Sequence, residues 1–188
     1  MFGKIFDHVI LGKYRDRLCT SELQFGFKRK SSTHACTMLL KEVLSYYANN
    51  QSSVYCTFLD VSKAFDRVQY CKLFRLLLRR NVPPCIVRVL LRFYIGHSIR
   101  ISWNCVASDF FTAYNGVKQG GVISPVLFCI YIDDLLVQLS LSCIGCYIGL
   151  NFCGALAYAD DIVLIAPTAS AMRKMLSVCE SFAARFDI

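Results

Sequence analysis

The chain has 188 residues, of which 55% are hydrophobic and 13% aromatic, and its formal net charge is +8. That length allows one domain, residues 1–188, with its own core, and the apolar content excludes a disordered chain. The positive charge suits a protein that faces nucleic acid. The eleven cysteines, without a secretion signal ahead of them, favour reduced thiols over a disulfide framework.

Apolar residues recur with the spacing of helices and strands along the whole chain, which predicts an α+β fold. Helices are expected at 33–49, 69–81, 83–95, 124–140 and from Pro167 to the end. Strands are expected at 54–60, 98–103, 109–113, 146–150 and 155–165. No repeat or linker divides the chain, so the helices should pack on one face of a single antiparallel sheet.

An acidic residue ends the first predicted strand. The apolar run Val54–Leu59 is followed directly by Asp60 and then by Val61–Asp66. A carboxylate at the end of a strand can meet side chains from the ends of neighbouring strands. Asp60 is therefore a candidate ligand for a hard cation such as Mg²⁺.

Two further acids lie later in the chain, at the tip of a predicted β-hairpin. The apolar runs Gly154–Ala157 and Ile162–Ile165 flank Tyr158–Asp161, which places Asp160 and Asp161 at the tip. Three carboxylates at strand ends can hold two Mg²⁺ ions, roughly 3.5–4 Å apart, for an in-line phosphoryl displacement. An isolated Asp-Asp pair is more often ordinary turn chemistry, so the accompanying motifs decide between the two interpretations.

A glycine-rich bend, Asn115–Gly121, lies between the two acidic sites. Its glycines allow the backbone to approach a nucleotide closely, and Lys118 and Gln119 supply polar side chains there. Ser124 and Pro125 then predict the start of a helix, with Ser124 as its N-cap.

The segment Tyr131–Asp134 repeats the Tyr-x-Asp-Asp pattern of Tyr158–Asp161. Its apolar neighbours follow helical spacing and continue into Leu135 and Leu136. Consecutive side chains on a helix point about 100° apart, so this pair should not converge with Asp60 as the hairpin pair can.

The stretch between Arg67 and Ser108 contains no acidic residue, which suits contact with a phosphate backbone. Its basic residues are Arg67, Lys72, Arg75, Arg79, Arg80, Arg88, Arg92 and Arg100. The same residues also fit the solvated faces of two helices, and the two interpretations are compatible.

Three segments resemble, in order and spacing, the palm motifs of reverse transcriptases: Phe58–Asp66, Val117–Pro125 and Tyr158–Asp161. A fourth segment, Gln24–His34, is similar to the fingers motif that precedes the palm in that family. The resemblance runs over nearly the whole chain and is strongest to the non-LTR (LINE-type) retrotransposon enzymes.

The resemblance implies a polymerase palm with an antiparallel sheet, packed helices and partial fingers. The partial fingers would occupy residues 1–50, and the palm with the remaining fingers helices residues 51–188. It also implies an RNA-directed DNA polymerase that extends a DNA primer on an RNA template with dNTPs. Two Mg²⁺ ions, with Mn²⁺ as a substitute, would be held by Asp60, Asp160, Asp161 and the carbonyl of Val61.

The resemblance further assigns residues to the nucleotide and the nucleic acid. Phe65 would lie against the sugar of the incoming nucleotide and exclude a 2′-hydroxyl, although a lone phenylalanine is more often core. The other nucleotide contacts would be Gln119, Gly120, Lys28, Arg29 and Lys30, although a bare basic run is more often a solvated turn. Contacts to nucleic acid are expected from Lys118, Tyr158, Arg75, Arg79 and Arg80.

The sequence departs from the family pattern at both ends. An upstream fingers segment, a further palm motif with a lysine, and a thumb are not found, so we expect weak or no activity from this chain alone. Two alternatives stay open: a non-catalytic remnant that binds nucleic acid, and an RNA-directed RNA polymerase. Phe65 argues against the second, because a small residue at that position would favour ribonucleotides.

The uncharged stretch from Leu135 to Ala159 is long enough to span a bilayer. It contains Gln138, Asn151 and several serines and glycines, which fits a buried core better. We therefore expect no membrane segment, and an intracellular protein of the nucleus or cytoplasm.

Overall fold

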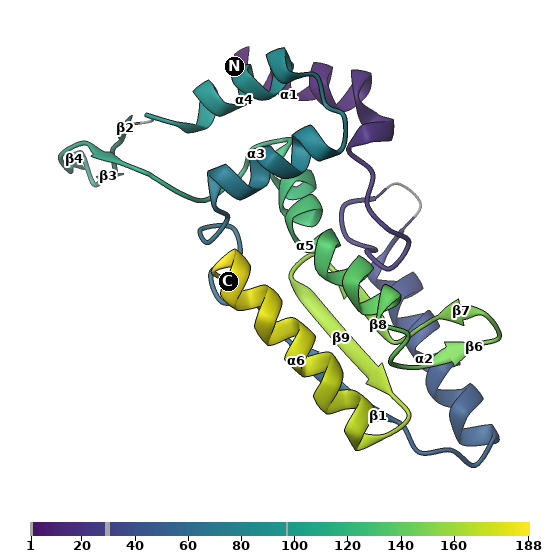
Figure 1. Ribbon diagram of the computed structural model, residues 1–188. Helices are drawn as coiled ribbons and strands as arrows, with labels where there is room; N and C mark the ends of the chain where they lie inside the picture. The colour runs from purple at the N-terminus through teal and green to yellow at the C-terminus, as the bar shows by residue number, and fades with distance from the viewer. Residues whose placement is uncertain (1, 29–30, 97) are drawn as a thin grey trace.

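The computed structural model describes residues 2–28, 31–96 and 98–188. A sheet of three antiparallel strands lies at its centre, in the order β1–β9–β8 (Figure 1). The strands are β1 (Tyr55–Leu59), β8 (Ala155–Tyr158) and β9 (Asp161–Ala166). The two apolar runs around the second acidic site thus form the hairpin that their pattern predicted.

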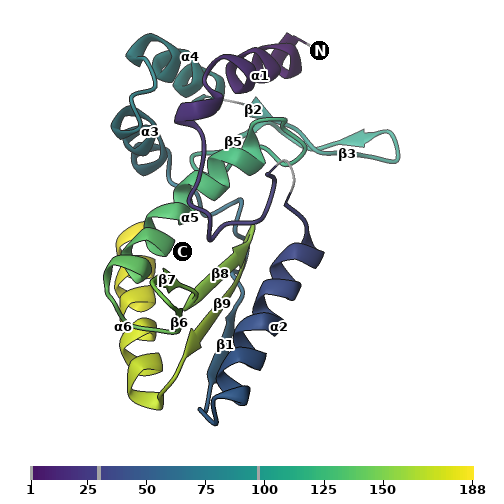
Figure 2. The ribbon, with the colours of Figure 1, turned by 90° about the vertical axis from the view of Figure 1, so that its right-hand side faces the viewer.

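Helices cover both faces of this sheet, as the view in Figure 2 shows. α6 (Ala169–Phe186) packs on β9 and β1, next to α5 (Ser124–Leu141), and α2 (Thr33–Asn49) packs on the opposite face. The prediction that helices would occupy one face was wrong, because successive strand residues point to opposite faces and both sets are apolar. One set consists of Ala155, Ala157, Ile162 and Leu164, and the other of Leu156, Val163 and Ile165.

A second group of helices lies beyond the end of the sheet that carries the hairpin tip (Figure 1). It contains α1 (Phe2–Lys13), the short 3₁₀ helix η1 (Arg15–Arg17), α3 (Tyr70–Arg79) and α4 (Pro84–Tyr94). The periodicity predicted α3 and α4 but not α1. Glycines near both ends of α1 lower its helix propensity, and tertiary packing compensates, as in the stacking of Phe6 on Phe93 at 5.1 Å.

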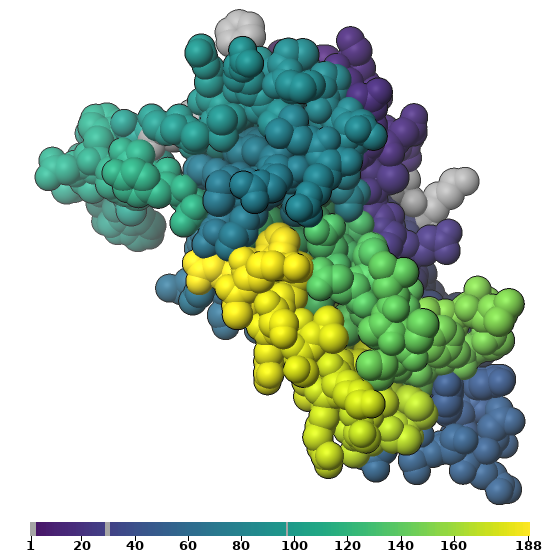
Figure 3. Space-filling view, viewed as in Figure 1, coloured from purple at the N-terminus to yellow at the C-terminus, as the bar shows by residue number. Residues whose placement is uncertain are grey.

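A narrow arm projects sideways from the molecule, visible in the space-filling view (Figure 3). It contains four two-residue strands: β2 (Ser98–Ile99), β3 (Ser102–Trp103), β4 (Val106–Ala107) and β5 (Phe111–Thr112). The single strand predicted at 98–103 is therefore split, and β4 was not predicted. Asn104 and Cys105 both have left-handed φ, 46° and 60°, which turns β3 tightly back into β4.

The remaining elements follow α5. β6 (Tyr147–Ile148) and β7 (Asn151–Phe152) form a small hairpin where one strand was predicted at 146–150, because Gly149 turns the chain with a φ of 61°. In the part of the chain that the structure describes, one helix is long and apolar enough to cross a membrane. It is α5, and 61% of that helix is buried in this fold.

Candidate active site

The register of the sheet brings Asp60 and the hairpin acids to one end. Leu59, the last residue of β1, pairs with Ile162, and Tyr158 pairs with Asp161. Asp60 therefore follows β1 at the position opposite Asp161, and Asp160 lies in the two-residue turn between β8 and β9. This end of the sheet faces the helices α1, α3 and α4 (Figures 1 and 2).

The three carboxylates lie at the surface of the protein. Asp60 and Asp161 are exposed and Asp160 is half-buried. Within residues 2–28, 31–96 and 98–188, none of them lies within salt-bridge distance of a lysine or arginine. The same residues contain no group of three acidic, histidine or cysteine side chains already close enough to hold a metal ion. The three acids are therefore suitable ligands for Mg²⁺ and lie at the same end of the sheet. Oxygen atoms of a substrate must complete the coordination of any bound metal ion.

Two backbone hydrogen bonds join the glycine-rich bend to the loop after β1. The N–H of Val117 donates to the carbonyl of Phe65, and the N–H of Gly116 donates to the carbonyl of Val68, both at 2.8 Å. A Cβ on Gly116 would lie 3.0 Å from the Cα of Asp66, and its φ is 92°. This close approach requires glycine. The first two predicted motifs therefore lie side by side.

The bend itself closes through a turn from Lys118 to Gly121, whose N–H donates to the carbonyl of Lys118 at 3.0 Å. Gly120 has a φ of 77°, which suits the third position of such a turn. Both Gln119 and Gly120 are exposed. They are thus free of the core, and they follow Val117, which bonds to the loop that carries Phe65.

Phe65 is half-buried and its ring stacks on Phe128 of α5 at 5.1 Å. The residue predicted to exclude a 2′-hydroxyl therefore packs against α5. Val61, whose carbonyl was predicted as a metal ligand, is also half-buried, one residue beyond Asp60.

Ser124 is not the N-cap that the sequence predicted. The N-cap of α5 is Ile123, and Ser124 is the first residue of the helix. Its buried hydroxyl lies 3.4 Å from the Oη of Tyr94, and a Cβ on Gly121 would come within 2.4 Å of it. The hydroxyl thus joins the bend to α4 instead of capping the helix.

The Tyr-x-Asp-Asp sequence at Tyr131–Asp134 lies on α5, as predicted. Asp133 is buried and forms a salt bridge with Arg80, with 2.6 Å between Oδ2 and Nη2. The Arg80 guanidinium also donates to the carbonyl of Cys19. These contacts give Arg80 a role in the fold, and its contact to nucleic acid stays a prediction. Periodicity could not find this role, because the partner lies 53 residues away.

Lys28, predicted as a clamp on a triphosphate, contacts its own loop in this structure. Its Nζ donates to the carbonyls of Thr20, at 3.0 Å, and Ser21. Burial lowers the pKa of Lys28, and the charge of Asp133 opposes that shift. Arg29 and Lys30, predicted for the same role, lie outside the described residues.

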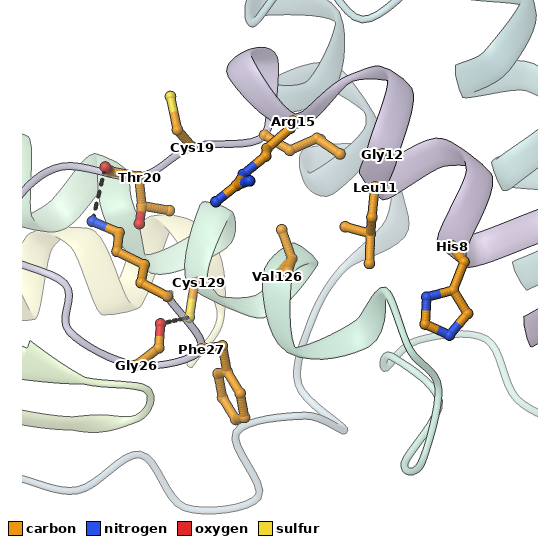
Figure 4. Close-up of a pocket in the computed structure, with 12 residues that line it drawn as sticks. His8, Leu11, Gly12, Arg15, Cys19, Thr20, Gly26, Phe27, Val126 and Cys129 are labelled. Carbon is orange, nitrogen blue, oxygen red and sulfur yellow. Dashed lines mark hydrogen bonds between the residues drawn. The ribbon is translucent and has the colours of Figure 1, made fainter. Parts of the chain in front are cut away.

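Lys28 also lines a cavity of about 800 Å³ between α1, the loop before Lys28 and the first turns of α5 (Figure 4). Val126 and Cys129 of α5 form one wall, and His8 and Leu11 of α1 lie opposite. Burial raises the pKa of Cys129 to about 12, so this thiol is neutral. It donates to the carbonyl of Gly26 at 3.9 Å.

The other residues predicted to contact nucleic acid are accessible. Arg75 and Arg79 are exposed on α3, and Tyr158 is half-buried beside the hairpin tip. The ammonium of Lys118 lies 5.4 Å from the centre of the Tyr94 ring. Burial lowers its pKa, against the effect of Asp7.

One residue at the site was not predicted. The fully buried side chain of Gln24 forms hydrogen bonds with the backbone of Ala159, next to Asp160. Its sequence signal is weak, since glutamine has no strong preference for such a position. Gln24 lies within the segment that resembles the fingers motif, and only the fold shows what it contacts.

Comparison with known proteins identifies the family of this chain. Residues 4–188 match the family model described as reverse transcriptase (RNA-dependent DNA polymerase). A Pol polyprotein from the type-2 retrotransposable element R2DM of Drosophila melanogaster is 34% identical over 71% of this chain and 13% of its own length. A Pol polyprotein from a type-1 element R2 of Nasonia vitripennis is 30% identical over 77% of this chain and 14% of its own length. The chain thus spans a small part of these relatives.

Solved structures of Candida tropicalis telomerase share the fold. One, in complex with a fragment of telomeric RNA, has a TM-score of 0.62 at 12% identity, over 90% of this chain and 29% of its own. An apo form truncated from the C-terminal domain has a TM-score of 0.60 at 12% identity, and the match covers 92% of this chain and 38% of the telomerase chain. The fold is thus the α+β polymerase palm that the motifs implied. By the family match and these relatives, the chain belongs to the reverse transcriptase family, among the polymerases of non-LTR retrotransposons.

Proposed function

We propose that this chain carries the catalytic centre of an RNA-directed DNA polymerase, which extends a primer 3′-hydroxyl with dNTPs on an RNA template. The observation that carries the proposal is the sheet register, which places Asp60 opposite Asp161 with Asp160 in the adjoining turn. Three carboxylates without a cationic partner in the described residues form a strongly negative site. Such a site attracts divalent cations.

Asp60, Asp160, Asp161 and the carbonyl of Val61 are the residues that would hold two Mg²⁺ ions, which Mn²⁺ can replace. When bound, such a pair stabilises the attacking and leaving oxygens of an in-line phosphoryl transfer. The exposure of Asp60 and Asp161 leaves room for the phosphates of an incoming nucleotide. The chain's own part is to hold the carboxylates together at one end of the sheet.

Phe65, Gln119 and Gly120 would border that nucleotide. The hydrogen bond between Val117 and Phe65 holds the bend against the loop after β1, so the three residues lie in one neighbourhood. The stack on Phe128 fixes the Phe65 ring. A fixed ring is suited to exclude a 2′-hydroxyl by steric contact, which favours dNTPs over ribonucleotides.

The template and primer would contact the basic surface of α3 and α4. Arg75, Arg79, Arg88 and Arg92 are exposed there, and positive side chains bind phosphates without regard to sequence. Tyr158 pairs with Asp161 and would contact the nucleic acid close to the reaction, and Lys118, on the glycine-rich bend, would be a further contact.

The test is incorporation of a single dNTP on an RNA template with a DNA primer and Mg²⁺. Asp160→Asn should abolish incorporation, because a metal ligand is lost while the side chain keeps its shape. Asp134→Asn is the matched control, since it alters the second Tyr-x-Asp-Asp sequence on α5, and it should retain activity.

Three outcomes would contradict the proposal. Equal activity in the wild type and Asp160→Asn would place the chemistry elsewhere. Salt-sensitive binding of RNA and DNA without turnover, unchanged in Asp160→Asn, would indicate a non-catalytic nucleic-acid-binding protein. Preference for ribonucleotides would indicate an RNA-directed RNA polymerase.

A further inference from the structure

Gln24 is fully buried beside the hairpin tip that carries Asp160. Its Oε1 accepts hydrogen bonds from the N–H groups of Ala159, at 2.9 Å, and Gly26, at 2.8 Å. Its Nε2 donates to the carbonyl of Ala159 at 3.1 Å. One carboxamide therefore satisfies both backbone groups of the residue immediately before Asp160.

Ala159 has a conformation that needs such support. Its φ is 59°, in the left-handed region, where a residue with a Cβ is less stable than in an ordinary strand or turn. The backbone angles of Ala159 set the direction in which the chain continues. They therefore also set the position of the Asp160 carboxylate relative to Asp60 and Asp161.

The segment around Gln24 is fixed against the outer edge of β8. Phe25 donates to the carbonyl of Ala157 at 2.7 Å, and Ala157 donates to the carbonyl of Leu23 at 2.8 Å. This places Gln24 in a parallel bridge beside the hairpin. A Cβ on Gly26 would lie 2.4 Å from the amide nitrogen of Ala159, so glycine at 26 permits the close approach.

The same segment is anchored to α5. The N–H of Ser21 donates to Oδ1 of Asp133 at 2.8 Å, and Cys129 contacts the carbonyl of Gly26. Residues 20–28 thus connect the buried helix to the hairpin tip. Gln24 is the side chain by which this connection reaches the residue before Asp160.

We propose that Gln24 is a positioning residue, whose carboxamide holds Ala159 in its left-handed conformation and so fixes the carboxylate of Asp160 for metal binding. This inference rests on the proposed role of Asp160 as a metal ligand. The chemistry selects an amide, because the side chain must accept two hydrogen bonds and donate one. Glutamate cannot donate when ionised and adds a negative charge beside three others, and methionine forms none of these bonds.

The first test needs no metal and no activity. In amide hydrogen exchange, the Ala159 N–H should exchange about tenfold faster in Gln24→Met than in the wild type, as expected for the loss of one buried hydrogen bond. Met175→Ala, which leaves a cavity under the buried part of α6, should not produce this local change. If Gln24→Met does not fold, slow exchange of the Gln24 side-chain amide protons in the wild type tests the same contact.

The second test measures metal binding and catalysis. Gln24→Met and Gln24→Glu should both weaken Mn²⁺ binding, followed by electron paramagnetic resonance, by about tenfold. In primer extension, kcat should fall while KM for the dNTP changes little. Adding Ala159→Gly to Gln24→Met should restore part of the loss, because glycine adopts a positive φ without the Cβ penalty.

The outcomes separate this inference from the proposed function. Unchanged exchange at Ala159 in the Gln24 variants, or unchanged Mn²⁺ binding in variants whose exchange is faster, would overturn the positioning role. If the wild type does not bind Mn²⁺, the proposed function fails, whereas weak or absent extension by this chain alone is already expected. In that case the positioning of a metal ligand fails with it, even if the exchange data show that Gln24 holds the tip.

Discussion

Replacing Asp133 with alanine should destabilise the fold far more than the same change at its neighbour Asp134. Asp133 is 3% exposed, with Oδ2 2.6 Å from Arg80 and Oδ1 accepting from Ser21 at 2.8 Å. Removing one partner of a buried ion pair costs about 3–5 kcal/mol, and the amide that loses its acceptor adds about 1 kcal/mol. The Arg80 side chain is 21% exposed, so water recovers part of the loss, and we expect a net loss of about 3 kcal/mol.

Urea unfolding followed by far-ultraviolet circular dichroism measures this loss. With a slope of about 2 kcal/mol per molar urea, the midpoint should fall by about 1.5 M. Asp134→Ala is the matched control, because within the described residues its carboxylate has no hydrogen bond or salt bridge. Its effect should stay within about 0.5 kcal/mol. Replacing both partners, as in Asp133→Leu with Arg80→Met, should be less harmful than Asp133→Ala alone.

Two results would contradict the predicted role of the buried ion pair. One is an equal loss of stability in Asp133→Ala and Asp134→Ala, which would mean that the ion pair contributes nothing beyond a surface carboxylate. The other is a double replacement as unstable as Asp133→Ala, which would mean that the loss does not arise from an unpaired buried charge.

Three further predictions concern the bend, the buried thiol and the basic helix. Gly116→Ala should lower stability by about 1–3 kcal/mol in the same unfolding assay, because of its positive φ and the close backbone beneath it. Gly12→Ala, in open space on α1, should be neutral or stabilising, and the opposite order would contradict the geometry. Burial raises the pKa of Cys129 to about 12 from 9.0, so the folded protein keeps a proton that the unfolded chain loses. The contribution of this thiol to the free energy of unfolding is complete below pH 9 and is lost as the pH rises towards 12. In a pH series of unfolding midpoints, Cys129→Ala should therefore reduce the fall of the midpoint between these pH values. Removing the charges of Arg75 and Arg79 should weaken the salt dependence of template-primer binding. The slope of the logarithm of the binding constant against the logarithm of the salt concentration should fall by about one for each phosphate that is no longer bound. An unchanged slope would exclude α3 from the interface.

The sequence alone was enough to predict the sheet end that carries the acids. The hairpin at Gly154–Ile165 depends on apolar runs and a short polar break, which are local properties. The helix at Tyr131–Asp134 follows equally from local periodicity, so the two Tyr-x-Asp-Asp segments could be told apart. The register of β1 with β9 then places Asp60 opposite Asp161, because the pair of residues at the strand ends fixes the positions of the residues next to them.

Packing in the folded chain determines which polar side chains form contacts within the protein and which remain exposed. Arg80 and Arg79 are adjacent in sequence and identical in chemistry, yet Arg80 is paired with Asp133 and Arg79 is exposed. Lys28 is engaged by carbonyls of its own loop. Gln24 meets Ala159 across 135 residues of sequence. Local spacing predicts which backbone forms, but a hydrogen bond between distant segments exists only once packing has brought them together and excluded water.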